Sequence, residues 1–229
     1  MTSIFAYPLK NAWIIVGDRL QTDIHSTIRA KTDFEVFPER MSKKIEIQGN
    51  WAMGFAGNSE QISKIRDIFY QNLNKIIKFK KIYKTIRTLY SDLSLLDVSC
   101  IIINIKTLKA YKIVFSDLPK DKLSHYYINS IEHAFIGSGI DKCRGTFLLS
   151  QLNELKQVEI KINVEKYIRH SVNVLNNVSI LDFQFTGSPY IYGCDIIICR
   201  KNNAKIYDII PNGYLYKSDN AKWKIMKRV

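Results

Sequence analysis

Thr2, Asp18 and Lys44 are the residues of this sequence whose types together suit one kind of catalysis. Thr2 follows Met1, which cells normally remove when a small residue comes second. A free N-terminal threonine would carry a nucleophilic hydroxyl and, in its own α-amine, a general base. A neighbouring lysine would favour deprotonation of that hydroxyl, and a carboxylate would keep the lysine charged. The three residues therefore predict hydrolysis of an amide bond by an N-terminal nucleophile.

Each of these residues also has a simpler explanation. Threonine is common at the second position, and Asp18 with Arg19 could form an ordinary turn at the end of a strand. Lys43 could take the place of Lys44 if the strand slipped by one residue. The alternation of polar and apolar residues over 44–48 favours Lys44, because it directs that side chain away from the isoleucines.

Apolar runs of two different periods predict a mixed α+β fold in which these residues lie on or beside strands. Two hairpins come first, around the turn-like pairs Lys10-Asn11 and Gly49-Asn50, with a long polar loop between them over 23–43. Strands and helices then follow in blocks, which favours antiparallel sheets with helices on the outside. The expected strands are 3–9, 12–17, 44–48, 51–56, 98–105, 109–115, 179–185, 194–200 and 204–210. The expected helices are 59–76, 81–93, 140–155 and 163–176.

The length and composition suit one globular unit. A chain of 229 residues that is 46% hydrophobic can bury a large core, and no linker or repeat divides the sequence. We therefore expect a single domain over residues 1–229, with a C-terminal extension at 210–229. The sequence has neither a long uncharged apolar run nor a signal-peptide pattern, which indicates a cytoplasmic protein without a membrane span.

The four cysteines lack metal-binding spacing and are expected to be buried thiols; the four histidines are expected on the surface or in loops. Neither a metal nor a cofactor is expected.

The net charge of +13 and the pI near 9.5 allow two interpretations. The basic residues could bind nucleic acid or an acidic partner, or they could cover the solvated faces of helices. The densest basic stretch, 75–87, alternates lysines with apolar residues at helical spacing, which is typical of a solvated amphipathic helix. Because no nucleic-acid-binding motif accompanies it, a nucleic-acid partner is not expected.

Four segments of the sequence together carry a resemblance to a known family. They are 2–22, which begins with Thr2 and ends Gly17-Asp18-Arg19-Leu20-Gln21-Thr22; Lys43-Lys44-Ile45 with Trp51-Ala-Met-Gly-Phe-Ala-Gly57; Phe135-Ile-Gly-Ser-Gly139; and Tyr192-Gly-Cys-Asp-Ile-Ile-Ile-Cys199. In this order they resemble segments of proteasome-type β subunits, which are N-terminal-nucleophile (Ntn) hydrolases. The turn at 51–57 is similar to that of bacterial HslV, and the length of 23–43 is similar to that of the proteasome-like Anbu proteins.

This resemblance implies a four-layer αββα sandwich and a set of site residues. Thr2 would be the nucleophile, Lys44 would lie beside its hydroxyl, and Asp18 would pair with Lys44. It further implies that the backbone N–H of Gly57 stabilises the developing oxyanion, that Ser138 orients the Thr2 amine, and that Thr22 contacts the substrate.

One segment departs from the family pattern. The family usually has an Asp and a Ser just before the late glycine-containing strand, and they help to fix the threonine. Residues 185–192 here contain Ser188 but no Asp, and Tyr190 or Tyr192 could occupy the place of the family's serine. The support of the Thr2 amine is therefore expected to differ, and activation would depend on removal of Met1.

These observations predict a threonine-type peptidase that cleaves peptide or protein substrates. The resemblance also implies a homo-oligomer, either a ring or an open helix, and leaves an ATPase or regulatory partner open. Two alternatives remain: an Ntn amidase or transpeptidase with a specific substrate, and a catalytically silent proteasome-like subunit with a structural or binding role, which could use its basic surface on nucleic acid.

Overall fold

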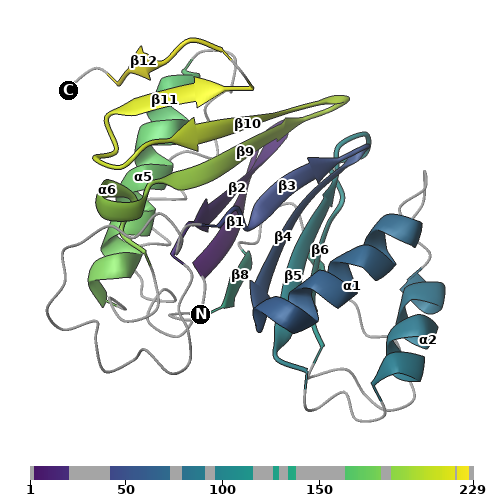
Figure 1. Ribbon diagram of the computed structural model, residues 1–229. Helices are drawn as coiled ribbons and strands as arrows, with labels where there is room; N and C mark the ends of the chain where they lie inside the picture. Colours follow the sequence, from purple (N-terminus) through teal and green to yellow (C-terminus); the bar gives the residue numbers. More distant parts are fainter. Residues whose placement is uncertain are drawn as a thin grey trace, which may run out of the picture.

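Two antiparallel β-sheets lie face to face, with helices on the outer side of each sheet (Figure 1). The computed structural model describes residues 3–20, 42–72, 79–90, 96–115, 126–128, 134–137, 163–181, 187–219 and 221–226. This is the αββα arrangement expected from the sequence.

The larger sheet has seven strands in the order β12-β11-β10-β9-β2-β1-β8. Every pair is antiparallel, and the register places Ser3 opposite Gly137 and Asp18 opposite Cys194. Both termini of the chain therefore contribute strands to one sheet. Its strands are β1 (Ser3–Leu9), β2 (Ala12–Asp18), β8 (Ala134–Gly137), β9 (Cys194–Arg200), β10 (Asn203–Ile209), β11 (Leu215–Ser218) and β12 (Lys224–Ile225).

The smaller sheet has five strands in the order β3-β4-β5-β6-β7, again all antiparallel. The first hairpin of this sheet turns at Gly49, whose φ of 57° suits glycine. Its strands are β3 (Ile45–Gln48), β4 (Trp51–Gly57), β5 (Val98–Asn104), β6 (Ala110–Val114) and β7 (Tyr126–Ile128).

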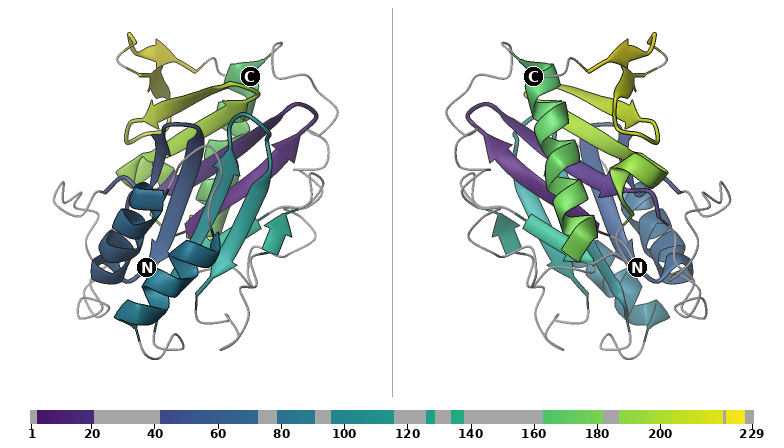
Figure 2. Two further views of the ribbon diagram at one scale, coloured as in Figure 1. Left: turned by 90° about the vertical axis from the view of Figure 1, so that its right-hand side faces the viewer. Right: turned by 90° about the vertical axis from the view of Figure 1, so that its left-hand side faces the viewer.

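The helices cover the two outer faces, as the turned views show (Figure 2). Helices α1 (Ser59–Asn72) and α2 (Phe79–Leu89) pack on the five-stranded sheet, and α5 (Val164–Leu181) packs on the seven-stranded sheet. A short helix, α6 (Pro189–Tyr192), precedes β9. Asn58 caps α1, because its Oδ1 accepts from the N–H groups of Glu60 and Gln61 at 3.0 and 3.1 Å.

Strand alternation explains how the sheets are buried on both sides. In β2, Ile14 and Val16 face α5, while Trp13 and Ile15 face the other sheet. The same alternation recurs in β4 and β5, so three apolar layers lie between the four layers of secondary structure. A strand that is buried on both faces reads as a continuous apolar run, which is how β2 and β9 appear in the sequence.

Two of the expected elements differ from the structure. The strand expected at 179–185 is wrong over 179–181, because α5 continues to Leu181. The C-terminal end of α5 contains β-branched residues, which favour a strand. Val174, Leu175 and Val178 nevertheless keep the helical spacing of the buried face. Helix α2 spans Phe79–Leu89 rather than the expected 81–93. Residues 182–185 and the helix expected after Gly139 lie outside the described residues.

The C-terminal residues extend the seven-stranded sheet. Strand β11 pairs with β10, and Tyr216 is buried in the same apolar layer as α5. Trp223 contacts the Lys217 ammonium, which lies 4.6 Å from the ring centroid. The treatment of 210–229 as an extension of a single domain stays a prediction.

The cysteines of the described residues fit the expectation from the sequence. Cys100, Cys194 and Cys199 are free and buried, and burial raises the pKa of each thiol. Cys143 lies outside the described residues. Over the part of the chain that the structure describes, we find no helix with the length and apolarity to cross a bilayer.

His170 corrects the expectation that the histidines lie on the surface or in loops. It lies half-buried on α5, with its ring 6.3 Å from that of Tyr7. Its Nε2 is buried and makes no hydrogen bond to the described residues. Burial, assisted by Lys166, lowers the pKa of His170 to about 4. The imidazole is therefore neutral in the folded protein at neutral pH.

The depressed pKa predicts a loss of stability in mild acid. Between about pH 6.5 and the folded pKa of about 4, the unfolded chain binds the His170 proton more readily than the folded one. The free energy of unfolding should fall over that range by up to about 3 kcal/mol from this group. Denaturant titrations at several pH values should show a flatter dependence for His170→Phe; an unchanged dependence would contradict the prediction.

Candidate active site

Several strand ends meet at one end of the sandwich and bring polar groups together there. Strand β2 ends at Asp18, β1 begins at Ser3, and β8 ends at Gly137 beside Ser3. From the second sheet, Lys44 immediately precedes β3. The structure thus brings Asp18 and Lys44 together, as the sequence predicted.

Asp18 is the centre of this group. Its side chain is fully buried and accepts three hydrogen bonds. Oδ1 accepts from the backbone N–H of Ser3 at 3.1 Å and from Lys44 Nζ at 2.9 Å, and Oδ2 accepts from the backbone N–H of Gly187 at 2.9 Å. A buried carboxylate with this many donors is held in one orientation. Asp18 therefore fixes both the lysine and the beginning of β1.

Lys44 lies between the two sheets with 7% of its side chain exposed. Its Nζ donates to Asp18 Oδ1 and to the carbonyl oxygen of Leu20. Burial lowers the pKa of Lys44 and outweighs the opposing effect of the Asp18 charge. The ammonium therefore gives up a proton more readily than that of an exposed lysine.

Two glycines allow the backbone beside Lys44 to approach the other sheet. A Cβ on Gly17 would lie 2.9 Å from Ile45 Cγ2, and one on Gly54 would lie 3.1 Å from the same atom. Ile45 therefore fills the space that these glycines leave, and the carbonyl oxygen of Lys44 accepts the N–H of Phe55 at 3.2 Å. This packing sets the register that turns Lys44, rather than the exposed Lys43, toward Asp18.

Gly57 ends β4 in a conformation that favours glycine, with φ of 125°. A Cβ there would lie 1.9 Å from the carbonyl oxygen of Asp97, which also accepts the N–H of Asn58 at 2.8 Å. The backbone at this turn therefore has no room for a side chain. The expected role of the Gly57 N–H toward an oxyanion stays a prediction.

We expect Gly57→Ala to lower the free energy of unfolding by about 3 kcal/mol, through backbone strain and the clash with the carbonyl. Gly49→Ala is the matched control, because Gly49 also has a positive φ but no atom lies within 4 Å of the position that its new methyl group would take. It should cost about 1 kcal/mol. Chemical denaturation measures both, and equal losses would contradict a steric cause at Gly57.

Arg19 forms a partly buried ionic cluster directly after Asp18. Its Nε and Nη2 donate to the two carboxylate oxygens of Asp195 at 3.1 and 2.6 Å, and Nη2 also donates to Asp208. Burial would lower the pKa of Arg19, but the hydrogen bonds and charges of Asp195 and Asp208 outweigh it and raise the pKa. The cluster ties the end of β2 to β9 and β10, so it supports the backbone that presents Asp18.

The segment that departs from the family pattern supports the site through its backbone. The N–H of Gly187 bonds to Asp18, and a Cβ on Gly187 would lie 2.6 Å from that of Leu20. Ser188 instead caps α6: its Oγ accepts the N–H of Tyr190 at 3.3 Å and donates to Asn176 at 3.1 Å. Tyr190 donates from its hydroxyl to Asn173 at 3.4 Å. In these contacts the hydroxyls of Ser188 and Tyr190 bond to residues of α5 and α6, not to Asp18 or Lys44.

Sequence reasoning missed the roles of Arg19, Asp208 and Gly187. The sequence suggested only a turn at Arg19, although a charged residue beside an apolar strand indicates a buried partner. Asp208 and Gly187 had no local signal, because their partners are 189 and 169 residues away. Of the remaining predicted site residues, Thr2, Thr22 and Ser138 lie outside the described residues. Among the described residues, no three His, Cys, Asp or Glu side chains are grouped so that they could hold a metal ion.

Comparison with known proteins identifies the fold. No family model matches the chain, and no curated protein matches it by sequence. The crystal structure of eukaryotic HslV from Trypanosoma brucei is similar over 86% of this chain and 99% of that one, with a TM-score of 0.58 and 18% identity. The chain therefore has an HslV-like proteasome-subunit fold, which confirms the resemblance noted in the sequence at the level of the fold.

Proposed function

We propose that this protein is an N-terminal-threonine hydrolase that cleaves peptide bonds after removal of Met1. The observation that supports this most is the buried Asp18–Lys44 pair, which is bonded to the N–H of Ser3. Ser3 is joined to Thr2 by one peptide bond, which supports a role for the pair beside an N-terminal threonine. The HslV-like fold supports the same function.

In the proposed reaction, Thr2 Oγ attacks the carbonyl carbon of the scissile peptide bond. The Thr2 α-amine takes the hydroxyl proton, directly or through a water molecule, and later delivers it to the leaving amine. Water then hydrolyses the resulting ester and regenerates the threonine. The Oγ proton therefore ends on the amine product, and in the second step water gives its hydroxyl to the acyl carbon and a proton back to Oγ.

Lys44 and Asp18 would lower the free energy needed to deprotonate the Thr2 hydroxyl. The Lys44 ammonium stabilises negative charge that develops on Oγ, and its lowered pKa brings it closer to the range useful for proton exchange. Asp18 holds Lys44 in place and, through Ser3, holds the backbone that carries Thr2. Gly57 would supply an oxyanion N–H, Ser138 would orient the amine, and Thr22 would contact the substrate backbone.

Hydrolysis of fluorogenic peptides tests this function. The wild-type protein should cleave members of a panel that varies the residue before the scissile bond, Thr2→Ser should retain part of the activity, and Thr2→Ala should lose it. Cleavage that survives in Thr2→Ala would overturn the assignment. Failure to cleave any peptide, with cleavage of a non-peptide amide that depends on Thr2, would indicate the amidase alternative.

A homo-oligomer and a cytoplasmic location are further parts of this proposal. The sequence resemblance implies a ring or an open helical assembly, and the HslV-like fold is compatible with either. Sedimentation of the full chain would determine the size of the assembly.

A further inference from the structure

Four β-hairpin turns meet at the end of the sandwich opposite to Asp18. The turns are 10–11, 49–50, 105–109 and 201–202, and each joins two antiparallel strands of the described sheets. Because Asp18 ends the strand that begins just after the first turn, these turns and the candidate active site lie at opposite ends of the strands. This end of the molecule is therefore separate from the proposed chemistry.

Backbone hydrogen bonds, one between the two sheets and one within the smaller sheet, hold three of these turns to one another. The N–H of Asn202 donates to the carbonyl of Ile105 at 3.0 Å, and the N–H of Ile105 donates to the carbonyl of Asn50 at 2.8 Å. The indole of Trp13, near the remaining turn, donates to the carbonyl of Leu108 at 3.0 Å. The side chains on the turns are thus carried by a connected backbone rather than by independent loops.

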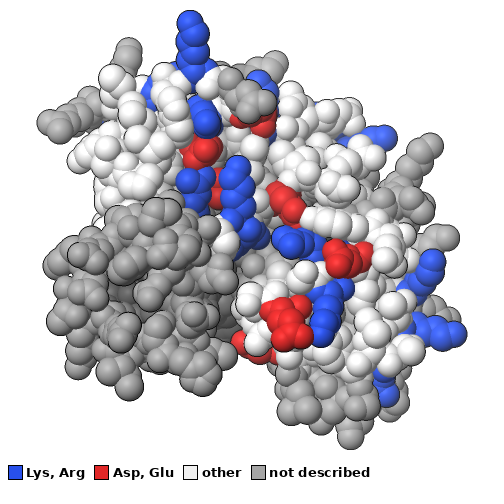
Figure 3. All heavy atoms as spheres, viewed as in Figure 1, with Lys and Arg blue, Asp and Glu red and all other residues white. Residues whose placement is uncertain are grey.

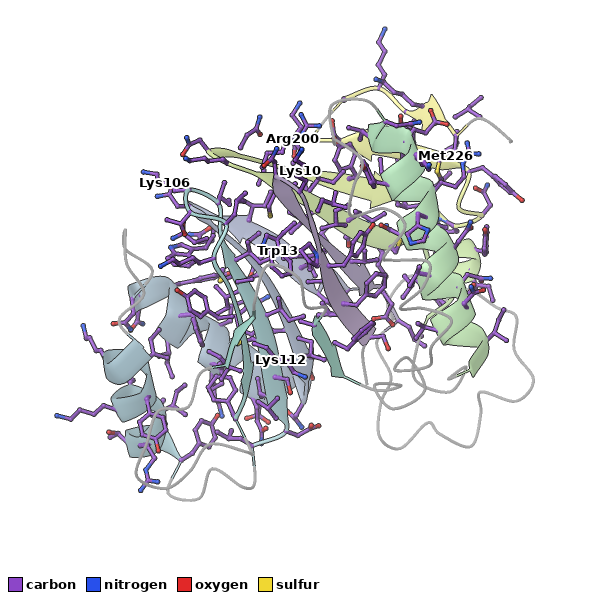
Figure 4. All side chains as sticks on the ribbon, turned by 180° about the vertical axis from the view of Figure 1, so that it is seen from behind. Lys10, Trp13, Lys106, Lys112, Arg200 and Met226 are labelled. Atoms are coloured by element: carbon purple, nitrogen blue, oxygen red, sulfur yellow. The ribbon has the colours of Figure 1, made fainter. Side chains whose placement is uncertain are left out.

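The turns and the strand residues next to them form a surface with one sign of charge, which we call the basic ridge. Its five lysines are exposed, and Arg200 is half-buried beside them. Residues 9–12, 48–51, 104–109 and 199–205 contain no Asp or Glu. Figure 4 shows Lys10, Lys106 and Arg200 at this end of the sheets. The lysines of the basic ridge are Lys10, Lys106, Lys109, Lys201 and Lys205.

The five lysines of the basic ridge carry charge that no carboxylate pairs with among the described residues. On the outer helices, by contrast, Lys64 pairs with Glu60 and Arg169 pairs with Glu165. On the face in Figure 3, basic and acidic side chains lie next to one another. Uncompensated cations on several connected turns attract a polyanion.

The chemistry of the basic ridge favours one class of polyanion. Its other exposed side chains, among them Asn11, Thr107, Asn202 and Asn203, are hydrogen-bond donors of the kind that contact phosphate and sugar oxygens. None of the large apolar side chains found exposed in the described part of the chain belongs to these turns. The ridge therefore has neither the apolar wedge that enters a bilayer nor the aromatic platform that stacks unpaired bases.

We propose that the basic ridge binds the phosphate backbone of double-stranded nucleic acid without reading its sequence. Lysines act as point charges toward phosphates and supply the salt-dependent part of such binding. The sequence raised nucleic acid only as a disfavoured alternative. It did not reveal the ridge, because the ridge is assembled from segments up to about 190 residues apart in the chain, the span from its first turn to its last. The basic stretch 75–87 is not part of the ridge.

Fluorescence anisotropy with a labelled duplex of about 20 base pairs tests the proposal, using the full chain over a series of salt concentrations. The triple variant Lys10→Gln, Lys106→Gln, Lys201→Gln should bind at least about tenfold more weakly at low salt, and the slope of log affinity against log salt should fall by about 2 to 3. Duplexes of DNA and RNA, each in two unrelated sequences, should bind with similar affinity within each type.

A matched control removes the same charge elsewhere. Lys81→Gln, Lys84→Gln, Lys166→Gln neutralises three exposed lysines on α2 and α5 and should leave the salt slope within about 0.5 of wild type. Thermal melting of both variants shows that they are folded. Peptide hydrolysis should be unchanged in both, so failure of the ridge proposal and failure of the proposed function remain distinguishable.

Three outcomes would overturn the proposal. The first is a wild-type protein that does not bind either duplex at low salt. The second is an equal loss in the ridge variant and its control, which would indicate net charge alone. The third is binding of polyglutamate or of anionic vesicles as tight as that of the duplex at the same salt, which would assign the basic ridge to another partner.

Discussion

Lys44→Met should slow covalent modification of Thr2 by at least about 100-fold, because it removes the cation beside the proposed nucleophile. Methionine keeps most of the length and apolar volume of the lysine stem, so the packing between the sheets should change little. The rate constant for reaction of the full chain with a threonine-directed electrophile measures the effect directly. It should be measured under conditions where thermal melting shows the variant to be folded.

Lys43→Met is the control for this experiment. Lys43 is exposed and precedes Lys44 in the sequence, so it has the same chemistry without the bond to Asp18. It should react within about threefold of wild type. A normal rate in Lys44→Met, or a large loss in Lys43→Met, would contradict the assignment of Lys44 and would indicate the one-residue slip that the sequence left open.

Asp18→Ala should lower the free energy of unfolding by about 3–5 kcal/mol. The substitution leaves the Lys44 ammonium buried without its carboxylate, and it leaves the N–H groups of Ser3 and Gly187 without their acceptor. Urea denaturation of the full chain gives this value, provided that the transition is two-state.

The double variant Asp18→Ala, Lys44→Met separates the ion pair from the rest of this loss. Without the stranded cation, it should be more stable than Asp18→Ala alone by at least about 1 kcal/mol. A loss below about 1 kcal/mol in Asp18→Ala would show that Asp18 does not hold the buried lysine, and additive losses in the double variant would show that the two side chains are not coupled.

Local patterns in the sequence were sufficient to predict much of the fold. The turn pairs at 10–11 and 49–50 and the apolar runs beside them predicted β1 to β4, and the ends of these strands carry Asp18 and Lys44. Turn chemistry and strand alternation act over a few residues, so the sequence displays them directly. The helical end of α5 was missed because β-branched residues favour strands unless tertiary packing selects a helix.

The parts of the site that could not be predicted depend on contacts between distant segments. Asp208 reaches Arg19 only because β9 lies between β10 and β2 in the sheet, and that strand order has no local signal. Gly187 bonds to Asp18 with its backbone, so its residue type indicates only that the approach is close. The basic ridge depends on the meeting of four turns, and it too becomes visible only when both sheets are in place.

The mass of the intact protein before and after treatment with a threonine-directed covalent inhibitor tests the proposed nucleophile most directly. We expect the untreated chain to lack Met1 and the treated chain to gain the mass of one inhibitor, with fragmentation placing the adduct on Thr2 and with no adduct in Thr2→Ala. Retention of Met1 with no adduct would contradict the enzyme assignment and indicate a silent proteasome-like subunit. An adduct that persists in Thr2→Ala would show that the reactive residue is not Thr2.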